Sequence, residues 1–273
     1  MRPTFYLPHP ALRPFVRHLL VVDVRLDGPA PGRFAPFPPT PHHCLNFYPG
    51  DATRSRQGTQ EFIDLPPSVI VGPQTSRVDL ALGVRHRFVS VALQPGGLFR
   101  LLRIPMHELR DQPLNAADLL GRELREVGEK LQAATEPRAM KDLVEAYLLR
   151  NLSLAPASPF EQAAKLMLGD NAAYSVDKVA ALACLSNRQL ERKANELLGY
   201  SPRFFARLIR FSRAYRLKVN QPHATWTTIS HQCGYYDQMH LIRDFKEFTA
   251  TTPRLLAREM QQAPLKIQGD QQH

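Results

Sequence analysis

The chain has 273 residues, 44 % of them hydrophobic, which is enough for one large or two ordinary domains with cores of their own. Lys and Arg number 35 against 25 Asp and Glu, and a formal net charge of +10 is typical of proteins that meet a polyanion. The N-terminal residues lack the apolar segment of a secretory signal, and no apolar run there approaches the roughly 20 residues that cross a bilayer. The three scattered cysteines fit neither a disulfide framework nor a zinc site. We therefore expect a cytoplasmic protein without membrane contact.

Residues 1–114 are rich in proline and in short apolar runs separated by Pro/Gly turns. The runs cover residues 18–24, 45–48, 67–71, 78–82 and 88–93. Short strands at this spacing predict a β-rich domain, either an antiparallel sandwich or a barrel, that senses a small molecule or assembles the protein.

Residues 115–152 change to an apolar period of three to four. Leu119, Leu120, Leu124, Val127 and Leu131 mark one amphipathic helix, and a second follows after Pro137. Two interpretations of this helical hairpin remain open: it packs on the β domain, or it forms a dimer interface.

A Ser/Ala/Pro stretch at residues 153–159 predicts a linker. Residues 160–258 then have a helical pattern, and residues 158–258 hold 15 Lys/Arg against 8 Asp/Glu, the denser positive charge of the chain. Residues 259–273 are predicted to be a disordered tail. The fold class that results is α+β, with a β-rich N-terminal domain, a helical hairpin and an all-α C-terminal domain.

A quasi-repeat occupies the helical part, at residues 179–192 and 229–243. Each copy has a short helix with a small inward residue, Ala180 or Ser230, followed by a tight turn and a second helix. This is the pattern of a helix-turn-helix, in which two helices must approach closely. Gly234 suits the turn of the second copy, whereas Cys184 occupies that position in the first, so a different turn geometry is one expectation there. The second helices are expected to begin at N-caps and to be anchored by leucines: Ser186 and Leu190 in one copy, Asp237 and Leu241 in the other.

Between the copies, Ser201 as N-cap and Pro202 at the first helical position predict a helix that continues to about residue 217. At 1.5 Å per residue it would span about 27 Å, close to the roughly 34 Å between successive major-groove segments. Such a rigid helix could hold two recognition helices in adjacent grooves.

These residues closely resemble the DNA-binding domain of the AraC/XylS family of bacterial transcription regulators over about residues 160–258. The matching stretches are LSNRQLER, LLGYSPRFF, RLIRFSRAYRL and ISHQCGYYDQMHLIRDFKEFTATTP. Three positions depart from the family's pattern: Cys184 and Ala250 replace usual glycines and Ala194 a usual aromatic, which puts the tilt of the first recognition helix in doubt. More weakly, residues 7–12, 71–75, 94–97, 104–109 and 118–121 resemble a β-rich sensor domain found in part of this family.

The resemblance implies that the exposed faces of the two second helices contact DNA. The candidate DNA-binding residues are Asn187, Arg188, Glu191, Arg192, Gln238, Met239, Ile242, Arg243 and Lys246. Glu191 has two readings, an acceptor for a cytosine amino group or part of a solvated face. The candidate phosphate contacts are Ser186, Arg203, Arg207 and Asp237, and the arginines of the helix from Pro202 are expected to face phosphate.

The sequence offers no constellation for catalysis, and we predict no enzyme activity, no cofactor and no metal. His42, His43 and Cys44 invite a metal interpretation, but neighbouring strand residues point to opposite faces, so a surface or turn role is predicted instead.

We therefore predict a sequence-specific, double-stranded-DNA-binding regulator under small-molecule control, most simply a homodimer, with RNA polymerase as a candidate partner. The alternatives are a ligand-independent dimeric activator and a catalytic β-barrel fused to a DNA-binding module.

Overall fold

The structure is a computed structural model that describes residues 3–26, 34–153, 155–169 and 176–263. Its N-terminal half is built from two antiparallel sheets, as the sequence predicts. The six-stranded sheet has the order β1-β2-β9-β4-β7-β10 and the four-stranded sheet the order β3-β8-β5-β6. The strands are β1 (Thr4–Tyr6), β2 (Val16–Arg25), β3 (Ala35–Phe37), β4 (Cys44–Phe47), β5 (Arg54–Gln57), β6 (Ile63–Asp64), β7 (Ser68–Val71), β8 (Val78–Ala81), β9 (Arg85–Leu93) and β10 (Pro113–Asn115).

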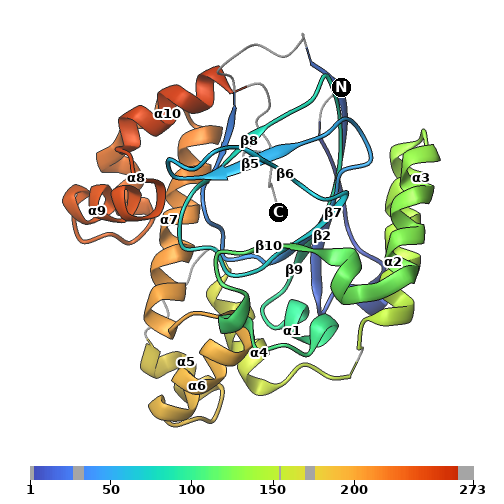
Figure 1. Ribbon diagram of the computed structural model, residues 1–273. Helices are drawn as coiled ribbons and strands as arrows, with labels where there is room; N and C mark the ends of the chain where they lie inside the picture. Colours follow the sequence, from blue (N-terminus) through green and yellow to red (C-terminus); the bar gives the residue numbers. More distant parts are fainter. Residues whose placement is uncertain (1–2, 27–33, 154, 170–175, 264–273) are drawn as a thin grey trace.

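Alternation along the strands gives the six-stranded sheet two apolar faces. On one face, Leu19, Leu45, Ile70, Val89 and Val91 pack against helices α2 (Ala116–Ala133) and α3 (Pro137–Asn151). On the other face, Leu20, Val22, Tyr48, Val69 and Phe88 form a smaller core between the sheets. The apolar stripes of both helices are buried in one core with the sheet residues, which favours the packing interpretation of this hairpin. The two helices lie together on one side of the sheets (Figure 1).

Short helices complete the N-terminal half: η1 (Pro10–Leu12), α1 (Gly97–Leu102) and η2 (Met106–Leu109). The C-terminal half is helical: α4 (Pro159–Met167), α5 (Val176–Leu182), α6 (Asn187–Leu198), α7 (Pro202–Asn220), α8 (Trp226–Gln232), α9 (Gln238–Thr249) and α10 (Pro253–Gln262). One core joins these helices, with Leu190, Phe205, Phe211, Leu241 and Phe245 among its fully buried members. They lie on the side of the sheets away from α2 and α3 (Figure 1).

The predicted tail begins too early. Helix α10 starts with Thr252 as N-cap and Pro253 at its first position, and it continues to Gln262, so residues 259–262 are helical. Leu256 of this helix is buried in the C-terminal core, which explains why the helix runs past residue 258. The remainder of the predicted tail, residues 264–273, lies outside the described residues.

Candidate nucleic-acid interface

Both helix-turn-helix units close their turn with the same backbone hydrogen bonds. The donors and acceptors are Leu185 N to Ala180 O (2.9 Å) and Cys184 N to Ala181 O (3.1 Å) in one unit, and Tyr235 N to Ser230 O (3.0 Å) and Gly234 N to His231 O (3.1 Å) in the other. This is the Schellman pattern, which requires a left-handed residue after the helix. Gly234 has φ +72° and Cys184 has φ +53°, so the expectation of a different first turn is wrong. Cys184 adopts the turn that glycine would adopt, at a steric cost.

The second helix of each unit begins at the predicted cap. The Ser186 hydroxyl oxygen accepts a hydrogen bond from Gln189 N, and the Gln189 side-chain oxygen accepts one from Ser186 N, a capping box at the start of α6. Asp237 accepts from His240 N at the start of α9, and this hydrogen bond lowers the pKa of its carboxyl group. Both side chains are therefore engaged as caps that position the two helices, and their contact with phosphate stays a prediction.

The residues predicted to read bases lie mainly on exposed helix faces. In α6, Asn187, Arg188, Glu191 and Arg192 are exposed, while Leu190 and Ala194 on the opposite face are buried. In α9, the exposed members are Gln238, Met239, Arg243 and Lys246, and Ile242 is half-buried. Met239 keeps 68 % of its surface exposed, so its apolar side chain is available for contact with a partner.

Two of these side chains have partners within the protein. Asn187 Nδ2 donates to Asp177 Oδ1 of α5 at 3.3 Å, and Gln238 Oε1 accepts from Thr227 Oγ1 of α8 at 3.0 Å. In each unit, a polar residue at the start of the second helix is thus held by the first helix, which fixes its position.

The arginines of α7 do not share one face toward solvent. Arg207 binds Asp244 and Glu247 of α9, with Nη2 to Asp244 Oδ1 at 2.7 Å, and the Glu247 hydrogen bond raises the pKa of the guanidinium. Arg210 lies over the Tyr235 ring at 5.3 Å, and Arg216 reaches the N-terminal half. Arg207 therefore links α7 and α9, and a phosphate would compete with these two carboxylates for its guanidinium, whereas Arg203 is exposed. Helical periodicity does not reveal these ion pairs of Arg207, because the acidic partners lie 37 and 40 residues away in the sequence.

A cavity of about 350 Å³ lies between the two sheets. Leu20, Tyr48, Leu80 and Phe88 form apolar parts of its wall, and His18, His42 and His86 are polar parts. Burial lowers the pKa of His86 to about 4, and burial together with the charges of Arg17 and Arg216 lowers that of His18 to about 4 as well. Neither nitrogen of His86, nor Nδ1 of His42, has a hydrogen-bond partner among the residues that the structure describes. Sequence reasoning missed this cavity, because most of its wall comes from two sheets that are assembled from strands in different parts of the chain.

The C-terminal half completes the cavity wall, since Ser212 and Arg216 of α7 line it. Two further contacts dock the halves: Tyr200 Oη donates to Gln74 O at 2.8 Å, and the guanidinium of Arg110 donates to Gly199 O. In the predicted linker region, Arg100 of α1 binds Glu161 of α4 with Nη2 to Oε2 at 2.7 Å, and the same guanidinium donates to the carbonyls of Ala155 and Pro156. The linker is thus held against the N-terminal half.

The histidines at residues 42 and 43 are buried, with 8 % and 5 % of their surfaces exposed, so the predicted surface role is wrong. His42 and Cys44 line the cavity, whereas the ring of His43 lies 6.4 Å from that of Tyr200. Adjacent side chains therefore point in different directions, as the strand argument expects. In the described part of the chain, no group of three or more His, Cys, Asp or Glu residues is arranged to hold a metal ion. No helix among the described ranges is both long and apolar enough to cross a bilayer.

Comparison with known proteins gives two family matches. Residues 179–259 match the family described as "Helix-turn-helix domain", and residues 4–115 match "Domain of unknown function (DUF6597)". No curated protein is significantly similar to the chain in sequence.

Solved structures show only distant likeness. ToxT from Vibrio cholerae O395 bound to (E)-4-(8-methylnaphthalen-1-yl)but-3-enoic acid is 12 % identical over 89 % of this chain and 99 % of that one, with a TM-score of 0.48. Unsaturated fatty acid bound wild-type ToxT from Vibrio cholerae strain SCE256 is 12 % identical over 87 % and 94 %, with a TM-score of 0.44. An AraC-type DNA-binding domain-containing regulator from Chromobacterium violaceum is 26 % identical over 37 % and 91 %, with a TM-score of 0.35.

Proposed function

We propose that the chain is a sequence-specific transcription regulator of the AraC/XylS type, controlled by a small molecule, because residues 179–259 match a helix-turn-helix family. The observation that carries the DNA-binding proposal is the pair of capped helices, α6 and α9, each with an exposed polar face and a buried leucine anchor. Helix α7 spans about 28 Å between the two units, which suits adjacent major-groove segments.

In this proposal the exposed residues of α6 and α9 read base edges. Arg188, Arg192 and Arg243 can bind guanine by two hydrogen bonds, and Met239 offers apolar contact to a thymine methyl group. Asn187 and Gln238 can use the amide atoms that their partners in the first helices leave available. Glu191 of α6 and Lys246 of α9 are exposed as well. Homodimer formation and contact with RNA polymerase stay predictions.

The test of base reading is selection of DNA fragments that the protein retains, followed by comparison of the Arg243→Ala variant on selected and unrelated DNA. We expect a loss of about 1–3 kcal/mol on selected DNA and relaxed preference at one base position. An equal loss on every sequence would show that Arg243 contacts only phosphate.

Phosphate neutralisation has its own test in two arginines of the same helix. Arg203→Met should lower the slope of log affinity against log salt by about one, because one phosphate contact is lost. Arg207→Met should leave that slope unchanged and destabilise the C-terminal half by about 2 kcal/mol, because Asp244 is then buried without its partner. The single tryptophan, Trp226, packs on Phe245 of α9 and reports this unfolding by fluorescence. A reduced slope for Arg207→Met would contradict the assignment.

The cavity supports effector control over a purely assembling role for the N-terminal half. Its volume lies in the range of small-molecule sites, and its largely apolar wall carries unpartnered histidine nitrogens. We propose as effector a mostly apolar molecule with at least one hydrogen-bonding group. Ligands found by thermal shift against a metabolite collection should lose their effect in Ala92→Phe, which fills the cavity, and keep it in Ala139→Phe on the exposed face of α3. Binding that survives Ala92→Phe would place the effector elsewhere.

A further inference from the structure

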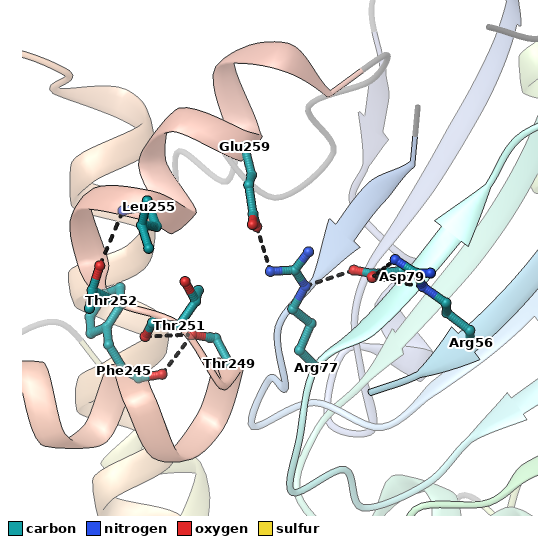
Figure 2. A network of polar contacts seen from close by, with 9 residues as sticks. All are labelled: Arg56, Arg77, Asp79, Phe245, Thr249, Thr251, Thr252, Leu255 and Glu259. Carbon is teal, nitrogen blue, oxygen red and sulfur yellow. Dashed lines mark hydrogen bonds and ion pairs between the residues drawn. The ribbon is translucent and has the colours of Figure 1, made fainter. Parts of the chain in front are cut away.

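A chain of ion pairs joins the cavity wall to the second helix-turn-helix unit (Figure 2). Arg56 of β5 donates from Nε and Nη2 to Asp79 Oδ2 of β8, at 3.2 Å each. Asp79 Oδ1 accepts from Arg77 Nε at 2.7 Å, and Arg77 Nη1 donates to Glu259 of α10. Two guanidinium and two carboxylate groups therefore alternate across the boundary between the halves.

The middle of this chain is shielded from water. The side chains of Arg77 and Asp79 keep 12 % and 10 % of their surfaces exposed, against 30 % for Arg56 and 38 % for Glu259. Charges this far from solvent are screened little and depend on their partners. If Glu259 moves away, the Arg77 guanidinium loses a carboxylate and one positive charge remains in excess.

The cavity end of the chain is Arg56, which is one of the lining residues. Its guanidinium lies between two aromatic rings, 4.8 Å from the centre of Phe34 and 4.7 Å from that of Phe62. A molecule in the cavity can therefore contact the Arg56 guanidinium, which binds Asp79 together with Arg77.

The other end is coupled to the second recognition helix through a short corner between α9 and α10. Thr249 Oγ1 donates to Phe245 O at 2.6 Å and to Thr251 O at 3.3 Å, and Leu255 N donates to the N-cap oxygen of Thr252 at 3.4 Å (Figure 2). These hydrogen bonds leave the corner little freedom, so a change in the position of α10 is transmitted to α9.

We propose that the Arg56–Asp79–Arg77–Glu259 chain is the connection through which the cavity controls the orientation of the second helix-turn-helix unit. A ligand acceptor that draws Arg56 away from Asp79 leaves that carboxylate to Arg77 alone. Arg77 then pairs more strongly with Asp79 and less with Glu259, and α10 is released from the four-stranded sheet. The proposal rests on the proposed function, because it names how effector control of DNA binding operates.

The experiment measures amide hydrogen exchange in α10 of the full chain, with neither DNA nor effector present. Glu259→Gln breaks the outer pair directly, and we expect about fivefold faster exchange in α10, as for loss of a favourable ion pair. Arg56→Met changes only the cavity end, yet it should also speed exchange in α10. The variant with both substitutions should resemble Glu259→Gln alone, because both act on one connection.

Arg54→Met is the matched control, since Arg54 is exposed on the same strand and also lies over the Phe62 ring, at 5.8 Å. Arg54→Met should leave amide hydrogen exchange in α10 unchanged. Unchanged α10 exchange in Arg56→Met, or equal acceleration in Arg54→Met, would overturn the proposal. If Arg56→Met unfolds the domain, Arg56→Gln gives the same comparison, because it also removes the charge that pairs with Asp79. Because exchange is read without DNA, failure here is distinguishable from failure of DNA binding.

Discussion

At the scale of single residues, two positions hold a left-handed backbone without glycine at the ends of the helix-turn-helix elements. Cys184 has φ +53° in the first turn, and Ala250 has φ +55° at the end of α9. The left-handed region costs a residue with a Cβ about 1–2 kcal/mol. Replacement by glycine removes this cost, but part of the gain is lost because glycine makes the unfolded chain more flexible. The Cys184 thiol is exposed, so little packing would be lost with it.

We therefore expect Cys184→Gly to stabilise the C-terminal half by about 0.5–1 kcal/mol, measured by urea unfolding followed through Trp226 fluorescence. Cys184→Ala keeps the Cβ and should change stability by less than about 0.5 kcal/mol. A destabilised glycine variant would mean that the thiol makes a contact of its own.

At the scale of elements, local signals predicted the C-terminal half well. Ser186, Ser201 and Asp237 are N-caps at the predicted positions, and Leu190 and Leu241 are fully buried. Strands β1, β3, β5, β6 and β10 were missed, because each is only two to four residues long and Arg54–Gln57 has no apolar pattern. The acidic partners of Arg207 and the position of Arg216 in the cavity wall were also missed. Periodicity places a side chain on a helix face but does not say which residues cover that face.

The contact of α6 with the N-terminal half depends on Gly199, the left-handed residue at its end. A Cβ at this position would lie 2.2 Å from Pro73 Cγ and 3.0 Å from Met106 O. Gly199→Ala should therefore push α6 away from η2 and speed amide exchange around residues 72–75 and 106–109. Gly234→Ala is the control, since its φ of +72° is nearly that of Gly199, at +75°, but no atom lies within 4 Å of its added Cβ.

Both alanine variants share the left-handed penalty of about 1–2 kcal/mol. Only Gly199→Ala should lose more stability than this penalty and show faster amide exchange in the N-terminal segments that contact α6. Equal effects of the two substitutions would show that the docking of α6 tolerates displacement.

At the scale of the whole molecule, buried neutral histidines make stability depend on pH. Burial lowers the pKa of His43 and His86 to about 4, below the value near 6.5 of an unfolded histidine. Between these values the unfolded chain binds protons that the folded chain does not. The contribution of these histidines to the free energy of unfolding therefore has its full value above about pH 6.5. It falls as the pH is lowered toward 4, by up to about 1.4 kcal/mol per pH unit for each histidine.

His86→Gln should flatten this slope by about 1.4 kcal/mol per pH unit, since glutamine does not titrate. Urea unfolding followed by circular dichroism at several pH values between 7 and 5 measures the slope directly. A slope unchanged by the substitution would show that water reaches the His86 ring and lets it take up its proton in the folded state.

The enclosure of the cavity by Ser212 and Arg216 has an evolutionary consequence. On the proposed function, recombination that exchanged the DNA-binding segment for that of another regulator would also replace two residues of the cavity wall. The two halves of this protein are therefore not interchangeable modules. A hybrid would have two cavity-lining residues from another protein, and selection for a new DNA site would change the ligand preference at the same time.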